Sequence, residues 1–140
     1  MRTLFRYCLV VLLGIAAIDA GACSCPARES WWDSKYPIVF RARVLATELT
    51  KEKYEELSVV TARFEVTERF RGDPSIIKAL RTTNGTRYGT CGIALTAGDE
   101  FIIHTGPEGW ATECTGTQSY HEKRDESLLE KLREARDKKK

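Results

Sequence analysis

Cysteine is the residue type with the clearest chemical potential in this chain of 140 residues. Cys8 lies in a segment that we expect to be removed on export, which leaves Cys23, Cys25, Cys91 and Cys114. An even number of cysteines in an exported chain predicts two disulfides. A bridge between Cys23 and Cys25 would close a ring too tight for the separations that a disulfide prefers. The residues therefore favour two bridges, each joining one cysteine of the N-terminal pair to a distant one, without deciding which.

Catalytic groups of other kinds are hard to assemble from this sequence. His104 and His121 belong to no HExxH or HxxxH pair that could hold zinc. There is no glycine-rich phosphate loop and no Gly-x-Ser-x-Gly motif. The run Cys23-Ser24-Cys25 lacks the C-x-x-C spacing of a redox couple, and a cysteine nucleophile would need a free thiolate. We therefore predict a binding protein rather than an enzyme, with no cofactor of its own.

Charge and composition narrow the class of partner. The chain has 22 Lys and Arg against 20 Asp and Glu, for a formal net charge of +2. A nucleic-acid binder usually shows a strongly basic face, so we expect no nucleic-acid partner. The hydrophobic content of 42% is that of a folded domain, and the length supports a single one. We expect the protein to act as a monomer.

Residues 1–22 have the pattern of a secretory signal peptide. Two arginines lie near its start, and the apolar run at 7–18 is shorter than the ~20 residues that a membrane-spanning helix needs. Ala20-Gly21-Ala22 then supplies the small residues that signal peptidase accepts. We expect a secreted, extracellular protein (periplasmic or on the outer surface if the source is bacterial) whose mature chain begins at Cys23. The alternative interpretation of this segment is a short membrane anchor.

Residues 23–120 are expected to form one mainly β domain. Alternation of apolar and polar side chains is clearest at residues 60–67, where Val60, Ala62, Phe64 and Val66 share one face. Several short strands separated by turn residues predict a sandwich or a small closed barrel. The other expected strands are 36–49, 76–83, 91–95, 100–105 and 110–115, with a solvated hairpin loop at 50–57 and turns at Gly72-Asp73-Pro74, Asn84-Gly85 and Gly98-Asp99.

Residues 121–140 form a charged tail with a helical pattern. Leu128, Leu132 and Ala135 share one helical face, and Leu129 lies beside it. We therefore expect a short amphipathic helix whose apolar face is available for docking on the β domain. Because both charge signs are interspersed, a solvated helix is favoured over a contact with an anionic surface.

The sequence also resembles a known family. Cys23-Ser24-Cys25-Pro26, directly after the expected cleavage site, resembles the N-terminus of the tissue inhibitors of metalloproteinases. Further likenesses follow in the family's order over about residues 23–120: the strand at 39–44, the segments 64–66 and 69–72, Cys91-Gly92 with Leu95, the strand at 101–103, and Cys114. The resemblance implies a netrin-like, five-stranded OB-type barrel with flanking helices. It also implies the disulfides Cys23–Cys91 and Cys25–Cys114. The family's third disulfide and its second, cysteine-rich domain have no counterpart in this sequence.

The resemblance implies a function as well, namely inhibition of zinc metalloproteases through Cys23. A catalytic zinc keeps one open position, which a free N-terminal amine and the neighbouring carbonyl oxygen can occupy as a five-membered chelate. An unperturbed α-amino group has a pKa of ~7.7–8.0, so a neutral fraction exists near pH 7. Ser24 would point into the pocket for the substrate side chain just beyond the scissile bond. The expected inhibitory contacts are Cys23, Ser24, Cys25, Pro26, Tyr88, Gly89, Thr90 and Cys91, with Cys23 as the ligand of the target's zinc.

Two alternatives to protease inhibition are compatible with the sequence. Ala20-Gly21-Ala22-Cys23 is also similar to a weak bacterial lipobox. A lipidated and acylated Cys23 could neither ligate zinc through its amine nor form a disulfide, and the protein would be a membrane-anchored netrin-like module. We expect no membrane association unless Cys23 is lipidated. The second alternative is a soluble netrin-like module that binds a partner other than a protease.

Overall fold

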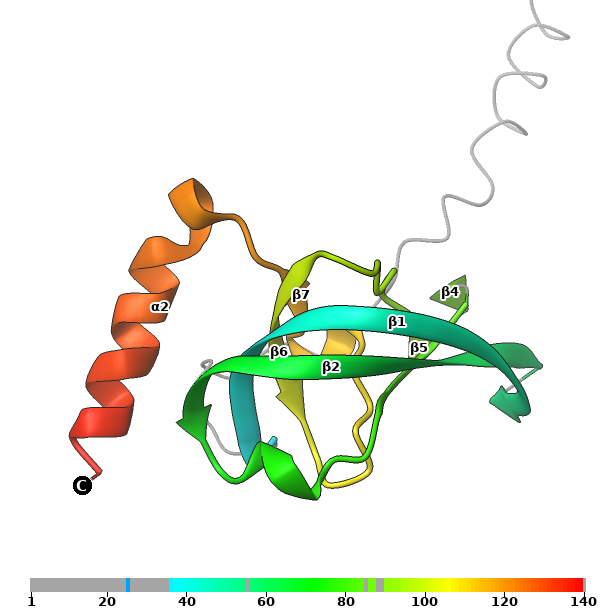
Figure 1. Ribbon diagram of the computed structural model, residues 1–140, viewed down its shortest axis with the longest axis horizontal. Coiled ribbons are helices and arrows are strands. Elements are labelled where there is room, and N and C mark those ends of the chain that lie inside the picture. The colour runs from blue at the N-terminus through cyan, green and yellow to red at the C-terminus, as the bar shows by residue number, and fades with distance from the viewer. Residues whose placement is uncertain (1–24, 26–35, 55, 85, 88–89, 140) are drawn as a thin grey trace, which may run out of the picture.

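The computed structural model describes residues 25, 36–54, 56–84, 86–87 and 90–139. These residues form a mainly β structure with one five-stranded antiparallel sheet, in the order β3-β2-β1-β6-β7, and a two-stranded sheet of β4 and β5 (Figure 1). The strands are β1 (Ile38–Tyr54), β2 (Leu57–Arg71), β3 (Leu80–Thr83), β4 (Thr86–Arg87), β5 (Thr90–Cys91), β6 (Glu100–Thr105) and β7 (Gln118–Ser119). The helices in the described part are the α-helix α2 (Glu122–Asp137) and two 3-10 turns, η1 (Pro74–Ile76) and η2 (Glu113–Thr115).

The two longest strands, β1 and β2, form a ribbon that reaches beyond the rest of the sheet (Figure 1). Their pairing runs from Val39 opposite Arg71 to Tyr54 opposite Leu57. The predicted loop at 50–57 is therefore wrong, because both strands continue through most of it. Charged side chains at the end of a two-stranded ribbon face solvent on both sides, so they do not oppose strand pairing. Thr50 adds a hydrogen bond across the ribbon, from its Oγ1 to the Val59 carbonyl at 2.9 Å.

The sheet curves like a barrel but does not close, so the predicted closed barrel is wrong in that respect. Its edge strands β3 and β7 have only four and two residues. An isolated parallel bridge joins β3 to the segment around Trp110: the Arg81 N–H donates to the Gly109 carbonyl and the Ala111 N–H donates to the Arg81 carbonyl, both at 2.8 Å. Trp110 packs there against Tyr54, with ring centroids 5.1 Å apart. Residues 110–115 thus form two isolated bridges, at Trp110 and Thr112, and the turn η2 rather than the expected strand.

Two other expected strands are shorter than predicted. The strand expected at 76–83 begins only at Leu80, because Pro74 starts η1 and the Asp73 carboxylate accepts a hydrogen bond from the Ser75 N–H at 3.0 Å. The strand expected at 91–95 ends at Cys91. Beyond it the Ile93 N–H donates to the Thr82 side-chain oxygen at 3.0 Å instead of continuing a ladder.

Apolar side chains fill both faces of the sheet. On one face, the strand residues Phe40, Ala42 and Val44 pack with β6. Ala62 belongs to this core, but Val66, which we expected on the same face of its strand, is exposed. The remaining buried members of this core are Ile38, Ala62, Ile77, Leu80, Leu95, Phe101, Ile103 and Ala111.

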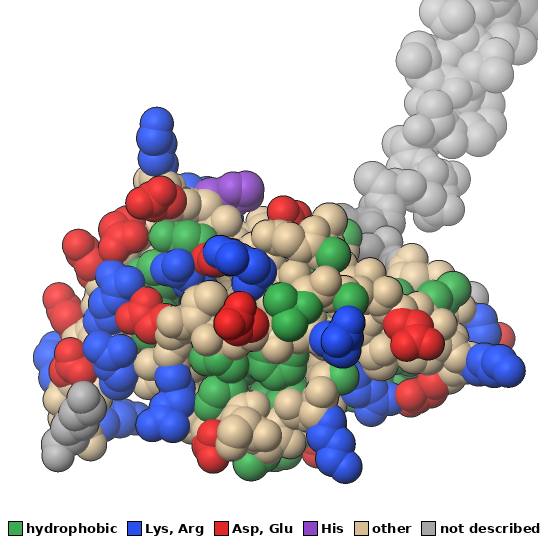
Figure 2. Space-filling view, viewed as in Figure 1, with side chains coloured by type: hydrophobic (Ala, Val, Ile, Leu, Met, Phe, Trp, Pro, Cys, Tyr) green, Lys and Arg blue, Asp and Glu red, His purple; other side chains and the backbone are tan. Residues whose placement is uncertain are grey.

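The helix α2 covers the other face of the sheet. Leu129 and Leu132 are 0% and 2% exposed and pack with Val39, Phe70 and Ile102. The predicted amphipathic helix is therefore present, and its apolar face docks on the β structure (Figure 1). Acidic and basic side chains are mixed over its outer surface (Figure 2). No helix in the described ranges combines the length and the apolarity needed to span a bilayer.

Candidate functional site

Three cysteines from distant parts of the chain meet at one end of the structure. Cys25 and Cys114 form a disulfide with a Cα–Cα distance of 5.1 Å across a sequence separation of 89. The Cys91 sulfur lies 3.8 Å from the Cys25 sulfur, and all three sulfurs are within 4.8 Å of one another. Cys91 is fully buried and is itself disulfide-bonded. Its expected partner, Cys23, lies outside the described residues, so the Cys23–Cys91 pairing stays a prediction.

The turn η2 holds Cys114 in a fixed position. The Thr112 side chain accepts a hydrogen bond from the Thr115 N–H at 3.2 Å, and the Thr115 side chain accepts one from the Thr112 N–H at 3.2 Å. The Thr115 hydroxyl also lies 3.0 Å from the Thr117 hydroxyl. Thr117 bonds in turn to the backbone of His104 on β6, accepting from its N–H at 3.2 Å and donating to its carbonyl at 3.3 Å. Cys114 is therefore anchored to a central strand of the sheet.

Cys91 is held between β3 and η2. Its strand, β5, pairs with β4 in the small second sheet. The next residue, Gly92, forms an isolated antiparallel bridge with Thr112, the residue that caps η2. The hydrogen bond from Ile93 to Thr82 then joins the same segment to β3. The cysteine cluster thus sits where three segments are hydrogen-bonded together, and Cys25 is bonded to that fixed point.

The expected inhibitory contacts are only partly within the described residues. The structure places Cys25 beside Cys91, and Thr90 directly precedes Cys91 on β5. It therefore brings Cys25 next to β5, the strand that follows Tyr88 and Gly89 in the sequence. Cys23, Ser24, Pro26, Tyr88 and Gly89 lie outside the described residues, and their roles stay predictions.

The three sulfurs are the one group of side chains in the described ranges whose types and spacing fit a metal ion. A metal would need deprotonated thiolates as ligands. Because Cys25 and Cys114 are bonded to each other and Cys91 is disulfide-bonded, the oxidised cluster offers none. Its chemical role in this form is to fix the backbone near Cys25, and the zinc in the proposal below belongs to the target enzyme.

Sequence reasoning missed a second candidate site beside α2. It is a pocket between the start of β1, the end of β2 and the last turns of the helix. The apolar face of the tail helix was visible in the sequence, but the strands on which it docks were not. The contacts that define this pocket join residues far apart in the chain, which no local pattern reports.

No protein-family model matches this chain, and no curated protein matches it significantly. The likeness to the tissue inhibitors of metalloproteinases therefore rests on the residues quoted for it above.

Proposed function

We propose that the protein is a secreted inhibitor of zinc metalloendopeptidases that blocks the target's catalytic zinc with its own mature N-terminus. One observation carries the proposal. Cys25, only two residues from the expected mature N-terminus at Cys23, is covalently joined to Cys114 in a fixed turn of the folded structure. The beginning of the mature chain is thereby tied to the body of the protein rather than left as a free end.

This attachment supports inhibition because it lowers the entropic cost of binding. Fixing the backbone of one residue costs ~1–2 kcal/mol of conformational entropy, and a free terminus would lose that entropy when it enters an active site. A terminus that a disulfide fixes has already lost this entropy during folding, which raises its affinity for a rigid cleft. The second disulfide that we predict, Cys23–Cys91, would extend the same effect to the first residue itself.

The chemistry requires a bare amine at Cys23. The amine nitrogen and the carbonyl oxygen of this residue would together occupy the open coordination position of the target's zinc and exclude the hydrolytic water. Zinc favours the deprotonated amine, whose unperturbed pKa of ~7.7–8.0 already leaves a neutral fraction near pH 7. Ser24 would enter the adjoining substrate pocket, where its small side chain permits targets of varied specificity.

The neighbouring segment would widen the contact. Cys91 lies beside Cys25 in the structure and belongs to β5, so an enzyme that receives the N-terminal run would also meet this strand. Tyr88 and Gly89 directly precede this strand and are expected to belong to the same surface. A contact made of two segments buries more of the inhibitor than the terminal residues could alone.

The first test is the chemical state of the natively exported protein. Intact-mass analysis and N-terminal sequencing should find an unmodified Cys23 as the first residue and four oxidised cysteines. A diacylglyceryl group, or a start at another residue, would overturn the proposal, and lipidation would instead support a membrane-anchored netrin-like module.

The second test compares two forms of the protein against a panel of zinc endopeptidases. One form begins at Cys23, and the other carries one additional N-terminal alanine, which moves the amine away from the zinc without changing the folded domain. We expect the first form to inhibit at least one member of the panel and the second to be at least 100-fold weaker. Circular dichroism should show that both are folded. Equal potency would overturn the chelation mechanism, and failure of the first form to inhibit any member would overturn the function.

A further inference from the structure

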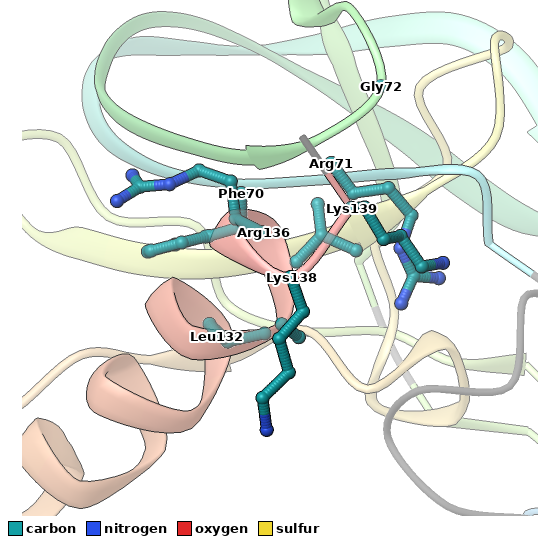
Figure 3. A pocket seen from close by; sticks show the side chains of 9 residues that line it. Phe70, Arg71, Gly72, Leu132, Arg136, Lys138 and Lys139 are labelled. Atoms are coloured by element: carbon teal, nitrogen blue, oxygen red, sulfur yellow. The ribbon is translucent and has the colours of Figure 1, made fainter.

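A pocket of about 420 Å³ lies between the β structure and the C-terminal end of α2 (Figure 3). Its volume falls within the ~300–1,000 Å³ typical of small-molecule sites. Val39 from β1, Phe70 from β2, and Leu132 and Ala135 from α2 supply its apolar lining. This lining is the continuation of the hydrophobic cluster that docks the helix.

Ion pairs hold the two walls of this pocket in place. The Arg133 guanidinium on α2 donates to both carboxylate oxygens of Glu68 on β2, at 2.8 and 2.9 Å. Arg136, one turn further on, lies 3.6 Å from the same carboxylate and donates to the Arg69 carbonyl at 3.4 Å. The end of the helix is thus fixed against the end of β2, and the pocket exists before any ligand arrives.

Gly72 keeps one side of the pocket free of a side chain. Its backbone has a φ of 64°, a left-handed conformation that favours glycine. A Cβ at this position would lie 2.5 Å from the Pro37 carbonyl oxygen. No larger residue fits here without moving the start of β1, so this part of the lining is backbone.

Among the described residues, the charged side chains that line this pocket are basic: Arg71, Arg136, Lys138 and Lys139. The side chains of Arg71 and Lys139 run toward the same side of the pocket, whereas Lys138 points away from them (Figure 3). The Lys139 ammonium adds a positive charge at this rim, and an anion placed beside it would be stabilised. The rim is therefore complementary to a negative group, and the lining to an apolar one.

We propose that this pocket binds a medium-chain fatty acid. The alkyl chain would pack against Val39, Phe70, Leu132 and Ala135, and the carboxylate would lie beside Lys139. A sugar or nucleotide would need polar groups along its length, which this lining does not offer. The proposal is independent of protease inhibition, because the pocket is built from the helix side of the sheet and uses none of the cysteine cluster.

Four probes that differ in chain length or in head-group charge separate this ligand class from its neighbours. The processed protein is titrated with decanoate, hexanoate, decanol and decyltrimethylammonium, each below its aggregation concentration, and binding is measured by calorimetry and by amide NMR shifts. We expect decanoate to bind with shifts at Val39, Leu132 and Ala135. Each buried methylene contributes up to about fourfold in affinity, so hexanoate should bind at least tenfold more weakly. Equal binding of decanoate and decyltrimethylammonium, or no decanoate binding, would overturn the proposal.

Charge reversal at the rim provides the matched variants. Lys139→Glu should weaken decanoate binding at least tenfold. Lys131→Glu, at an exposed position of the same helix outside the pocket, makes the same change in net charge and should leave binding unchanged. Both variants should retain the wild-type midpoint of unfolding, since neither residue belongs to the core. Equal losses in the two variants would show that attraction to the overall charge, and not this pocket, holds the ligand.

One further arm distinguishes a free acid from a membrane lipid. The same variants are mixed with phosphatidylglycerol vesicles, and sedimentation measures the bound protein. We expect no binding that depends on Lys139. Vesicle binding that is lost in Lys139→Glu but retained in Lys131→Glu, without decanoate binding, would overturn the assignment in favour of a lipid surface.

Discussion

Asp125 is the residue on which the start of the tail helix depends. It is 4% exposed, yet its carboxylate is fully engaged. It accepts hydrogen bonds from the Arg124 guanidinium and from the His121 N–H, each at 2.8 Å. The hydrogen bond from Arg124 is the main reason that the pKa of Asp125 lies below its ordinary value, and it outweighs the effect of burial. The N-cap residue His121 makes no capping hydrogen bond through its own side chain. Asp125, in the first turns of the helix, instead accepts a hydrogen bond from the His121 N–H and so satisfies a backbone donor at the helix start.

Replacing Asp125 should destabilise the protein in a pH-dependent way. A lowered pKa in the folded state stabilises the protein above the ordinary aspartate pKa of about 3.9, and this contribution is lost as the pH falls through the folded-state value. Asp125→Asn should therefore lower the free energy of unfolding by about 1–3 kcal/mol at pH 7. Urea denaturation should show that the difference from wild type shrinks below about pH 3.9. Glu130→Gln, at an exposed position of α2, is the matched control; a difference that stays constant down to pH 2 would contradict this account.

At the residue scale, the sequence identifies the chemical groups better than their partners. The cysteines and the turn Gly72-Asp73-Pro74 are recognisable from type and spacing alone. The choice between the two disulfide arrangements came from a family resemblance, because the residues by themselves left it open. Asp125 and Glu68 could not be singled out among 20 acidic residues, since their importance comes from arginines that only the folded chain places beside them.

At the scale of elements, the docking of α2 turns a charged tail into part of the folded unit. Leu129 is fully buried between the helix and the sheet, and Ile102 faces it from β6. The pattern of Leu128, Leu132 and Ala135 predicted this helix because it repeats at helical spacing. The length of the β1–β2 ribbon was not predictable in the same way. Beyond Val44, β1 has no buried side chain, so no hydrophobic alternation marks its outer half as strand.

Truncation of Leu129 measures the strength of that docking. Leu129→Ala should lower the free energy of unfolding by about 2–5 kcal/mol, because it removes a buried side chain and leaves a cavity. Leu45→Ala makes the same chemical change at a side chain on β1 that is 49% exposed, and it should cost less than about 1 kcal/mol. Chemical denaturation of both variants gives the comparison. Similar small losses in the two would mean that α2 contributes little to the folded unit.

At the scale of the whole molecule, a disulfide connects the beginning of the described chain to a sheet that does not close. The edge strands β3 and β7 are not paired with each other, and an isolated parallel bridge joins Arg81 of β3 to Trp110 instead. The Cys25–Cys114 bond joins segments 89 positions apart and so restricts the unfolded chain strongly. The open sheet was not predicted, because short strands at regular spacing are compatible with both a closed and an open barrel.

Removal of that disulfide should affect stability and inhibition separately. Cys25→Ser with Cys114→Ser should lower the free energy of unfolding by about 4–5 kcal/mol in the chain-entropy model. Below its unfolding midpoint the double variant should still show native circular dichroism but inhibit at least tenfold more weakly than wild type, because its N-terminus has lost one attachment. Undiminished inhibition by the folded double variant would contradict the role of preorganisation.

The most direct measurement of zinc chelation uses an endopeptidase that this protein inhibits, with its zinc replaced by cobalt(II). Visible absorption of cobalt reports its ligands, so the enzyme is titrated with the protein that begins at Cys23 and, separately, with the alanine-extended form. Coordination by the Cys23 amine and carbonyl predicts a spectral change that saturates at one protein per enzyme for the first form and is absent for the second. Full inhibition with an unchanged cobalt spectrum would contradict the central claim, since the enzyme would then be blocked without contact to its metal.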